Sequence, residues 1–136
     1  MFLSMGRSNP PFMSGVPELL VLRLLARKTM YGYELVKAVR VMTGEAIALG
    51  EGVIYPALHG LEKNGALKAT RRPVNGRTRV YYRVTAKGQR RLDRLTAEWD
   101  RVSSGVRAAL VAPQGAIDAL SKSLIAPCWV TSRRGV

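Results

Sequence analysis

The apolar residues of this chain recur at helical spacing in several stretches, which glycine, proline and short polar segments separate. The first stretch follows Pro17, a residue suited to a helix start because its missing N–H would have no partner there. It predicts a largely buried helix that ends near residues 27–28. A second helix is predicted after Thr29, which is expected to cap it, and Gly44 ends it. Its predicted core face consists of Tyr33, Leu35, Val36, Val39 and Met42.

A third, short helix is predicted over residues 51–64, where apolar side chains lie on one face. Pro56 falls close to the first turn, where a proline disrupts little because the N–H that it lacks has no helical partner. Gly65 follows the last periodic residue, at the position where a helix cap needs left-handed backbone. Between the second and third helices, the apolar residues 46–49 are expected to form a strand that pairs with a following hairpin.

That hairpin is predicted over residues 68–83. Asn75 and Gly76 form a strong turn signal, because both turn residues must adopt positive φ. On the return strand, apolar positions alternate with cationic and aromatic ones, so one face is apolar and the other basic. A short helix followed by a basic hairpin is the layout of a winged helix-turn-helix. In that layout the helix enters a DNA groove and the hairpin, or wing, contacts the DNA backbone.

A longer helix is predicted over residues 86–112, with Thr85 as its cap and Pro113 just beyond its end. Its apolar residues repeat at alternating steps of three and four, which makes an a/d seam that needs a partner helix. Because a single domain of this size has no second long helix, we expect the partner to be the same helix of another copy, in a two-fold dimer. The seam consists of Leu92, Leu95, Trp99, Val102, Val106 and Ala109. A further short amphipathic helix is expected on Ile117, Leu120, Leu124 and Ile125.

These elements define the predicted fold class, which is mainly α with a small β-wing: a winged helix-turn-helix domain plus a C-terminal dimerisation helix. We assign residues 1–16 to a flexible N-terminal arm, 17–85 to the DNA-binding domain, 86–112 to the dimerisation helix and 113–136 to a C-terminal tail. A chain of 136 residues can bury one modest core. No apolar run approaches the roughly 18 residues needed to cross a membrane, so we predict no membrane partner.

The residue types available for chemistry are few. The single cysteine, Cys128, excludes an intrachain disulfide and suits a reducing cytoplasm, where we expect the protein to act. One histidine and no clustered carboxylates leave no metal site and no catalytic triad. We therefore predict no metal, no other cofactor and no enzymatic activity.

Positive charge is concentrated in the predicted hairpin and in the helix after it. The net charge is +13, and residues 67–110 hold 12 Lys and Arg against 3 Asp and Glu, whereas residues 1–66 hold 7 against 5. Because neutralising phosphates releases counterions and dominates affinity, such a focused basic surface favours a polyanionic partner. Its coincidence with a hairpin favours double-stranded DNA over a basic surface that is merely solvated.

Four sequence blocks carry a resemblance to a known family. They are Met-Tyr-Gly-Tyr-Glu-Leu at 30–35, Gly-Val-Ile-Tyr-Pro-Ala-Leu-His at 52–59, Leu-Glu-Lys-Asn-Gly at 61–65 and Tyr-Tyr-Arg-Val-Thr-Ala-Lys-Gly at 81–88. In order and spacing they resemble the PadR-like transcriptional regulators, over about residues 17–110. The resemblance implies a homodimeric repressor that binds a pseudo-palindromic promoter operator and releases it when a small, often aromatic, effector binds.

Two positions depart from the family pattern. Val53 stands where the family usually carries a hydroxyl residue, and Gly60 stands where a basic residue is common. Val53 therefore lacks a hydrogen bond to phosphate or base. Both departures affect target sequence and affinity more than fold.

Contacts to DNA are expected from the second and third helices and from the hairpin. Tyr31 opens the second helix, where free N–H groups and the positive end of the helix dipole favour phosphate. Tyr55 and His59 lie one turn apart and share a face of the third helix, the expected recognition helix. Outward residues of the hairpin are expected on the DNA backbone or in the minor groove. The predicted DNA-binding residues are Tyr31, Gly52, Val53, Tyr55, His59, Lys68, Arg71, Arg72, Arg77, Arg79 and Tyr81.

Trp99 lies in the middle of the predicted seam and has two interpretations. As a large apolar residue it anchors the interface between two copies. Alternatively, two copies of Trp99 facing each other across the two-fold axis bracket a flat aromatic effector, which the resemblance supports. The predicted dimer and effector residues are Leu92, Leu95, Trp99, Val102 and Val106.

Two other functions are compatible with the sequence. A protein-interaction module on the same fold would dimerise or bind a partner helix through the seam and would have lost specific DNA binding, in keeping with Val53 and Gly60. Binding of RNA or single-stranded DNA would have only Tyr31, Tyr55 and Tyr81 as stacking platforms.

Overall fold

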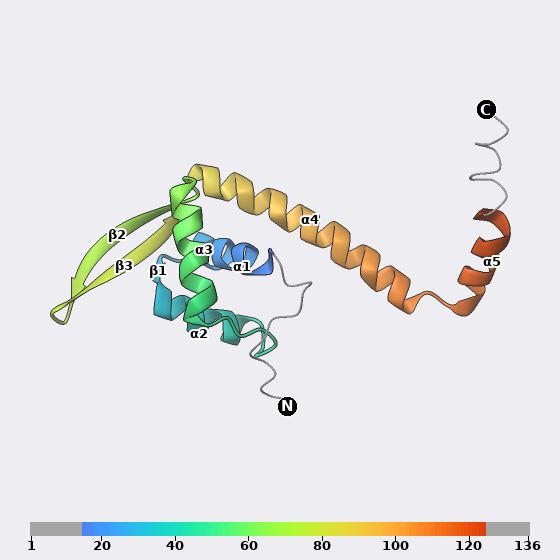
Figure 1. Cartoon of the computed structure of the whole chain (residues 1–136), viewed down its shortest axis with the longest axis horizontal. Helices are drawn as coiled ribbons and strands as arrows, with labels where there is room; N and C mark the ends of the chain where they lie inside the picture. Colours follow the sequence, from blue (N-terminus) through green and yellow to red (C-terminus); the bar gives the residue numbers. More distant parts are fainter. Residues whose placement is uncertain (1–14, 125–136) are drawn as a thin grey trace. The chain divides into compact units, whose positions relative to one another are not determined.

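The computed structural model describes residues 15–124 and contains, in that range, five helices and three strands. In chain order they are α1 (Val16–Arg27), β1 (Met30–Tyr31), α2 (Gly32–Met42), α3 (Glu51–Lys63), β2 (Leu67–Val74), β3 (Arg77–Val84), α4 (Ala86–Val111) and α5 (Gln114–Leu124), as Figure 1 shows. The predicted fold class, mainly α with a small β-wing, is confirmed. Most of the predicted N-terminal arm lies outside the described residues, as do Ile125 and Cys128.

The chain divides into two compact units, Met1–Ala97 and Glu98–Val136. The first unit contains α1 to β3 and the first turns of α4, and it holds the hydrophobic core. The second contains the remainder of α4 and α5, on which apolar side chains are exposed. Of the helices between residues 15 and 124, none combines the length and the apolar character needed to span a bilayer.

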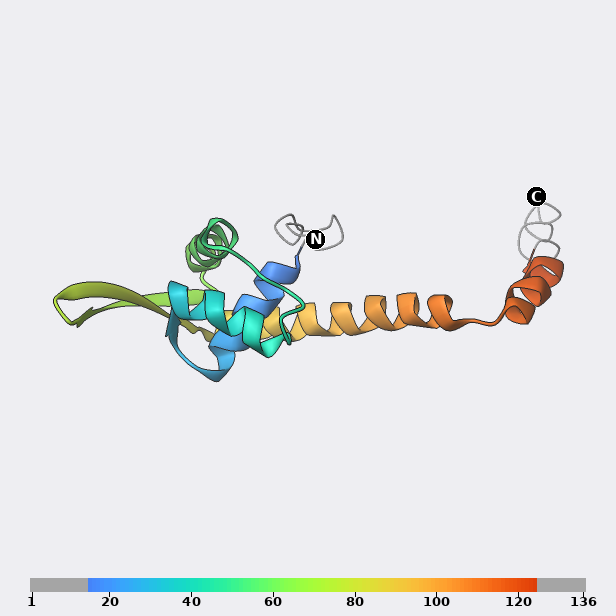
Figure 2. The same ribbon diagram turned by 90° about the horizontal axis from the view of Figure 1, so that it is seen from below.

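The core forms where the first three helices pack together and against one face of the sheet. Leu22 of α1, Leu35 of α2 and Leu58 of α3 are completely buried. Tyr82 of β3 is only 4% exposed, and burial, followed by the nearby charge of Glu62, raises the pKa of its phenol. Seen from below, α3 forms a layer of its own beside α1 and α2 (Figure 2), so one side of α3 packs into the core and the other faces solvent.

The wing is an antiparallel sheet of strand order β1-β3-β2. Its hairpin turns at Asn75 and Gly76, whose φ angles of 50° and 78° confirm the turn predicted from these residues. The third strand differs from prediction. It is β1, whose Met30 and Tyr31 pair with β3. The prediction that residues 46–49 form this strand is wrong, because that apolar segment serves as a packed connection in which Leu49 is buried.

The start and the face of α2 also differ from prediction. Thr29 does not cap this helix, because β1 intervenes and Tyr31 occupies the cap position. Tyr33 is 49% exposed, since it lies two positions from Leu35 and so points to the opposite side of the helix. Met42 is 65% exposed because it is the last residue of α2 and extends beyond the core.

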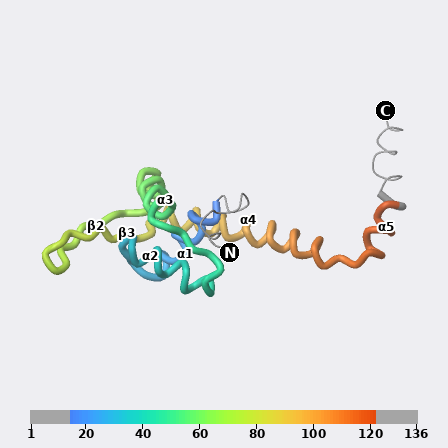
Figure 3. The backbone as a smooth tube through the Cα atoms, turned by 60° about the horizontal axis from the view of Figure 1, so that its bottom comes forward, coloured from blue at the N-terminus to red at the C-terminus, as the bar shows by residue number. Residues whose placement is uncertain are grey.

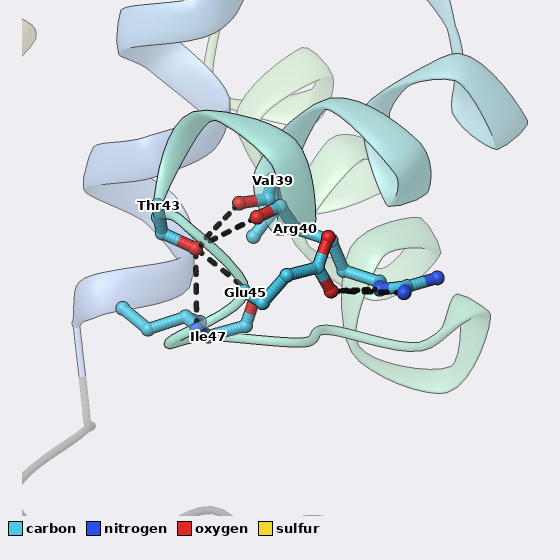
Figure 4. A network of polar contacts seen from close by, with 5 residues as sticks. All are labelled: Val39, Arg40, Thr43, Glu45 and Ile47. Atoms are coloured by element: carbon cyan, nitrogen blue, oxygen red, sulfur yellow. Dashed lines mark hydrogen bonds and ion pairs between the residues drawn. The ribbon is translucent and has the colours of Figure 1, made fainter.

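Side-chain contacts fix the connection between α2 and α3 (Figure 4). The Thr43 hydroxyl donates to the Val39 carbonyl oxygen at 2.7 Å and accepts the N–H of Ile47 at 3.1 Å, which closes the loop on itself. Arg40 forms an ion pair with Glu45 at 2.8 Å, beside the bend where Glu45 has a φ of 68°. The closed loop constrains how α3 follows α2, and these two helices form the helix-turn-helix.

Thr85 joins the end of α3, the base of the wing and the start of α4. Its N–H donates to the Ala66 carbonyl oxygen at 3.0 Å, and its hydroxyl donates to the Gly65 carbonyl oxygen at 2.6 Å. The hydroxyl also accepts the N–H of Gly88 at 3.1 Å, which confirms Thr85 as the cap of α4. Gly65 has the predicted left-handed backbone, with a φ of 87°. The tube in Figure 3 shows how α3 leads into the wing and the wing returns into α4 at this junction.

The first turns of α4 belong to the core of the unit Met1–Ala97. Arg91 forms an ion pair with Glu18 of α1, and this hydrogen-bonded contact raises the pKa of the Arg91 guanidinium. Leu92 is 1% exposed and Leu95 is half-buried against the same core. The prediction that Leu92 faces a second copy is therefore wrong, because the protomer already covers this side chain. Helical spacing alone does not distinguish burial in the chain's own core from burial against a second copy.

Candidate nucleic-acid interface

Two tyrosines and two arginines gather on one face of the wing. Tyr31 of β1 pairs with Tyr81 of β3, and their ring centroids lie 5.4 Å apart with the planes inclined at 69°. The guanidinium carbon of Arg79 lies 4.4 Å from the centre of the Tyr31 ring. That of Arg72 lies 4.4 Å from the centre of the Tyr81 ring. We refer to these four residues as the arginine–tyrosine cluster, and all four are among the predicted DNA-binding residues.

Strand register explains why the cluster forms. Residues 79 and 81 are two apart on β3 and therefore share a face, and Arg72 and Tyr31 lie directly opposite them on the neighbouring strands. An edge-to-face aromatic pair contributes about 0.5–1.5 kcal/mol, and each cation–π contact contributes about 0.5–1 kcal/mol at an exposed site. These contacts fix two guanidinium groups at the surface, where Arg72 is exposed and Arg79 is half-exposed. Fixed guanidinium donors suit the oxygens of phosphate groups.

The start of α2 is less open to phosphate than predicted. The N–H of Tyr31 donates to the Glu34 carboxylate at 3.2 Å, so this helix-terminal donor already has a partner. The carboxylate also offsets part of the positive end of the helix dipole. Tyr31 therefore contributes to the surface through its ring and its contact with Arg79.

Arg77 and Lys68 lie on the same face of the hairpin as the cluster. Arg77 pairs with Val74 beside the turn, and Lys68 pairs with Arg83 near the base. Lys68, Arg77 and Arg83 are exposed cations. Arg83 was not among the predicted DNA-binding residues, although its alternation with the apolar positions of β3 was the signal that placed it on this face.

Arg71 does not join this face. It pairs with Val80, on the face that carries Tyr82, whereas its neighbour Arg72 belongs to the cluster. Adjacent residues of a strand point to opposite faces, so Arg71 and Arg72 do not act on one flat surface.

The exposed side of α3 carries little positive charge. Gly52 and His59 are exposed, whereas Val53 and Tyr55 are half-buried against the core. The rings of Tyr55 and His59 lie 6.3 Å apart, on the face that the sequence predicts them to share. Lys63 at the end of the helix is the only Lys or Arg in α3. Cationic contacts next to this helix must therefore come from other elements.

Tyr55 connects α3 to α2 by lying across Gly32, the first residue of α2. A Cβ atom at Gly32 would lie 2.5 Å from both Cζ and Oη of the tyrosine, so only glycine allows this approach. The role of Gly32 was not predicted from the sequence. The available signal was a glycine at the start of a predicted helix, where a better helix former would ordinarily stand.

Replacing Gly32 with alanine should destabilise the protein by about 1–2 kcal/mol, because the Tyr55 ring must leave its place on α2. In a Tyr55→Ala background the same substitution should cost almost nothing, and urea unfolding of the four proteins of this cycle measures the difference. Gly52→Ala is the matched control, since no atom lies within 4 Å of a Cβ there. An equal cost of Gly32→Ala in both backgrounds would contradict the contact.

A closed α2–α3 pair, followed by an antiparallel wing with a fixed cationic face, defines a winged helix-turn-helix protein. Within the described residues, no group of three or more His, Cys, Asp and Glu side chains could hold a metal ion. The chain belongs to the PadR-like family of transcriptional regulators, whose family model matches residues 21–94. It is therefore a DNA-binding transcriptional regulator and not an enzyme.

Solved structures of bacterial regulators share this fold. A transcriptional regulator from Clostridium thermocellum superposes with a TM-score of 0.68 at 30% identity, over 76% of this chain and 100% of that one. A PadR-like transcriptional regulator from Bacillus cereus does so with a TM-score of 0.66 at 28% identity, again over 76% and 100%. An uncharacterized protein from Lysinibacillus sphaericus is 33% identical over 84 residues, which are 61% of this chain and 77% of that protein.

Proposed function

We propose that this protein is a homodimeric repressor that binds an operator in double-stranded DNA through α3 and the wing. The arginine–tyrosine cluster carries the proposal, because it holds two guanidinium groups in fixed positions on the face that also carries Arg77. In this arrangement α3 enters the major groove, and the wing contacts the phosphates beside it. Wing contacts set affinity and register, whereas Gly52 and His59 approach the base edges.

The proposed dimer forms through the part of α4 that the protomer leaves uncovered. Trp99, Val102 and Val106 are 47%, 47% and 53% exposed and recur at steps of three and four. Leu110, 79% exposed, follows the seam position Ala109 and adds exposed apolar surface one turn beyond Val106. Pairing two such seams removes apolar surface from water, which favours association. Two Trp99 rings across the two-fold axis would form the site for a small, flat aromatic effector that releases the DNA.

Replacing Arg77 and Arg79 together with alanine should weaken binding to all duplex sequences alike. Each lost phosphate contact lowers the slope of log K against log salt by about 0.9, so the slope should flatten by up to about two units. Fluorescence anisotropy of labelled duplexes over a salt series measures this slope. Arg23→Ala combined with Arg107→Ala removes the same charge from exposed positions outside the wing and should leave the slope close to that of the wild type.

Three outcomes would contradict parts of the proposal. An unchanged slope in the wing variant would exclude the wing from the interface. A wild-type protein that self-associates in sedimentation experiments but binds no duplex near physiological salt would support a protein-interaction module in its place. A monomer in dilute solution would exclude the dimer.

A further inference from the structure

A second group of cations lies in a cleft between the end of α3 and the start of α4, within the unit Met1–Ala97. The cleft has a volume of about 240 Å³. Its lining residues are Asn64, Ala66, Lys87, Arg90, Arg91 and Arg94. The four cations recur at steps of three, one and three along α4, and this spacing places them on one side of the helix.

Two acidic residues near this cleft, Glu18 and Asp93, have hydrogen-bond partners, and one of them pairs with a cation. Glu18 of α1 forms an ion pair with Arg91, which neutralises one of the four cations. Asp93 of α4 accepts a hydrogen bond from the Gln89 side chain at 3.0 Å. The other ion pair formed by residues 15–121 lies in the connection between α2 and α3.

Lys87, Arg90 and Arg94 are therefore exposed cations that share a cleft without an acidic partner among the described residues. We refer to these three residues as the α4 cations. Like charges at helical spacing destabilise a helix by a few tenths of a kcal/mol per pair. Their accumulation in one cleft is thus unfavourable for the free protein and favourable for binding an anion.

The cleft adjoins one side of α3 at Asn64. This residue also lines a neighbouring cleft of about 250 Å³, whose other lining residues include Pro56 and Gly60 of α3 and Glu18 of α1, the acid that is paired with Arg91. Space is open beside Gly60, where a Cβ would have no atom within 4 Å. The Asn64 side-chain oxygen accepts the N–H of Ala66 at 3.3 Å, which leaves its NH₂ group as a donor toward a ligand. A phosphate chain that follows this side of α3 meets the α4 cations at its end.

We propose that the α4 cations and Asn64 bind phosphate groups of the DNA strand that passes the C-terminal end of α3. This contact rests on the proposed binding of duplex DNA and is separate from the wing. Guanidinium groups bind phosphate oxygens through paired N–H donors, and the lysine adds a point charge. The contact would also provide charge that α3 itself lacks, since Lys63 is its only Lys or Arg.

The test replaces Arg90 and Arg94 with glutamine and measures duplex binding over a salt series. The slope of log K against log salt should fall by up to about two units, with unchanged circular dichroism, because both side chains are exposed. Combining Arg90→Gln and Arg94→Gln with the wing substitutions should lower the slope by the sum of the two effects. Arg101→Gln with Arg107→Gln, which removes the same charge farther along α4, should leave the slope unchanged.

The outcomes separate this contact from the proposed function. If the wild type binds duplex DNA and the wing variant weakens it, but the Arg90→Gln, Arg94→Gln variant keeps the wild-type slope, the α4 contact is wrong and the repressor proposal stands. If the wild type binds no duplex, both are wrong. If inorganic pyrophosphate raises the melting temperature of the wild type and not of this variant, while DNA slopes are equal, the cleft binds a free phosphorylated molecule and the DNA assignment is wrong.

Discussion

Replacing Gly88 with alanine should destabilise the protein by about 3 kcal/mol, which corresponds to a fall in melting temperature of roughly 10 °C. A Cβ at this position would lie 2.1 Å from the Ala66 carbonyl oxygen and 2.9 Å from a methyl carbon of Val84. The carbonyl is backbone and accepts the N–H of Thr85, so it cannot turn aside as the end of a side chain could. The first turn of α4 must therefore separate from the base of the wing. Urea unfolding followed by circular dichroism measures the loss.

Gly60→Ala is the matched control, because Gly60 also lies in a helix of the same unit but has open space where a Cβ would be. Alanine there should be neutral or should stabilise the protein by about 0.5–1 kcal/mol, since it lowers the entropy cost of helix formation. Equal unfolding midpoints for the two variants would show that the close approach of Gly88 to Ala66 does not limit stability.

Replacing Tyr81 with alanine should weaken DNA binding about tenfold or more while the protein remains folded. The substitution removes the ring that contacts both Tyr31 and Arg72, contacts that together contribute about 1–2.5 kcal/mol. A loss of 1.4 kcal/mol from the fixed arrangement of the arginines corresponds to a factor of ten in affinity. Because every cation is still present, the salt slope should change by less than one unit, unlike the slope of the Arg77→Ala, Arg79→Ala variant.

Tyr81→Phe keeps the ring and loses only the hydroxyl, so its affinity for duplex DNA should stay within about twofold of the wild type. Anisotropy titrations at one salt concentration compare the three proteins directly. If Tyr81→Ala and Tyr81→Phe both bind as tightly as the wild type, the cluster does not position the wing arginines. If both variants lose the same affinity, the phenol hydroxyl is the important group and the ring is not.

Signals that act within a few residues predicted much of the fold. Asn75 and Gly76 specified the turn of the wing, and Gly65 specified the cap of α3, because each of these positions needs a positive φ. Pro113 similarly marked the end of α4. The strand β1 was missed for the opposite reason. Two residues are too few for an alternating pattern, and Tyr31 becomes a strand residue only by pairing with a partner far along the chain.

Apolar spacing predicted that side chains are covered but not what covers them. Leu92 fits the seam of α4 as well as any later residue, yet it is buried in the core of its own chain. Residues 46–49 are apolar for a similar reason, since Leu49 fills the core from a connection that has no regular structure. Such cases are settled by tertiary packing, which a one-dimensional pattern does not contain.

The candidate site was predictable in residue type and less so in arrangement. Sequence alone named all four members of the arginine–tyrosine cluster: Arg72, Arg79 and Tyr81 as hairpin residues, and Tyr31 for its place at the start of the second helix. Their mutual contacts depend on register, and a shift of one residue moves a side chain to the other face, as the separation of Arg71 from Arg72 shows. The contribution of Tyr31 depends further on β1, which the sequence did not reveal.

The hydrogen bonds of Thr85 couple α3, the wing and α4 mechanically. The Thr85 side chain links the end of α3, the base of the wing and the first turn of α4 through hydrogen bonds to Gly65 and Gly88. A twist of that opening turn therefore acts on the end of α3 and on the base of the wing together. With α3 and the wing on DNA as proposed, torque applied to α4 should weaken both contacts at once.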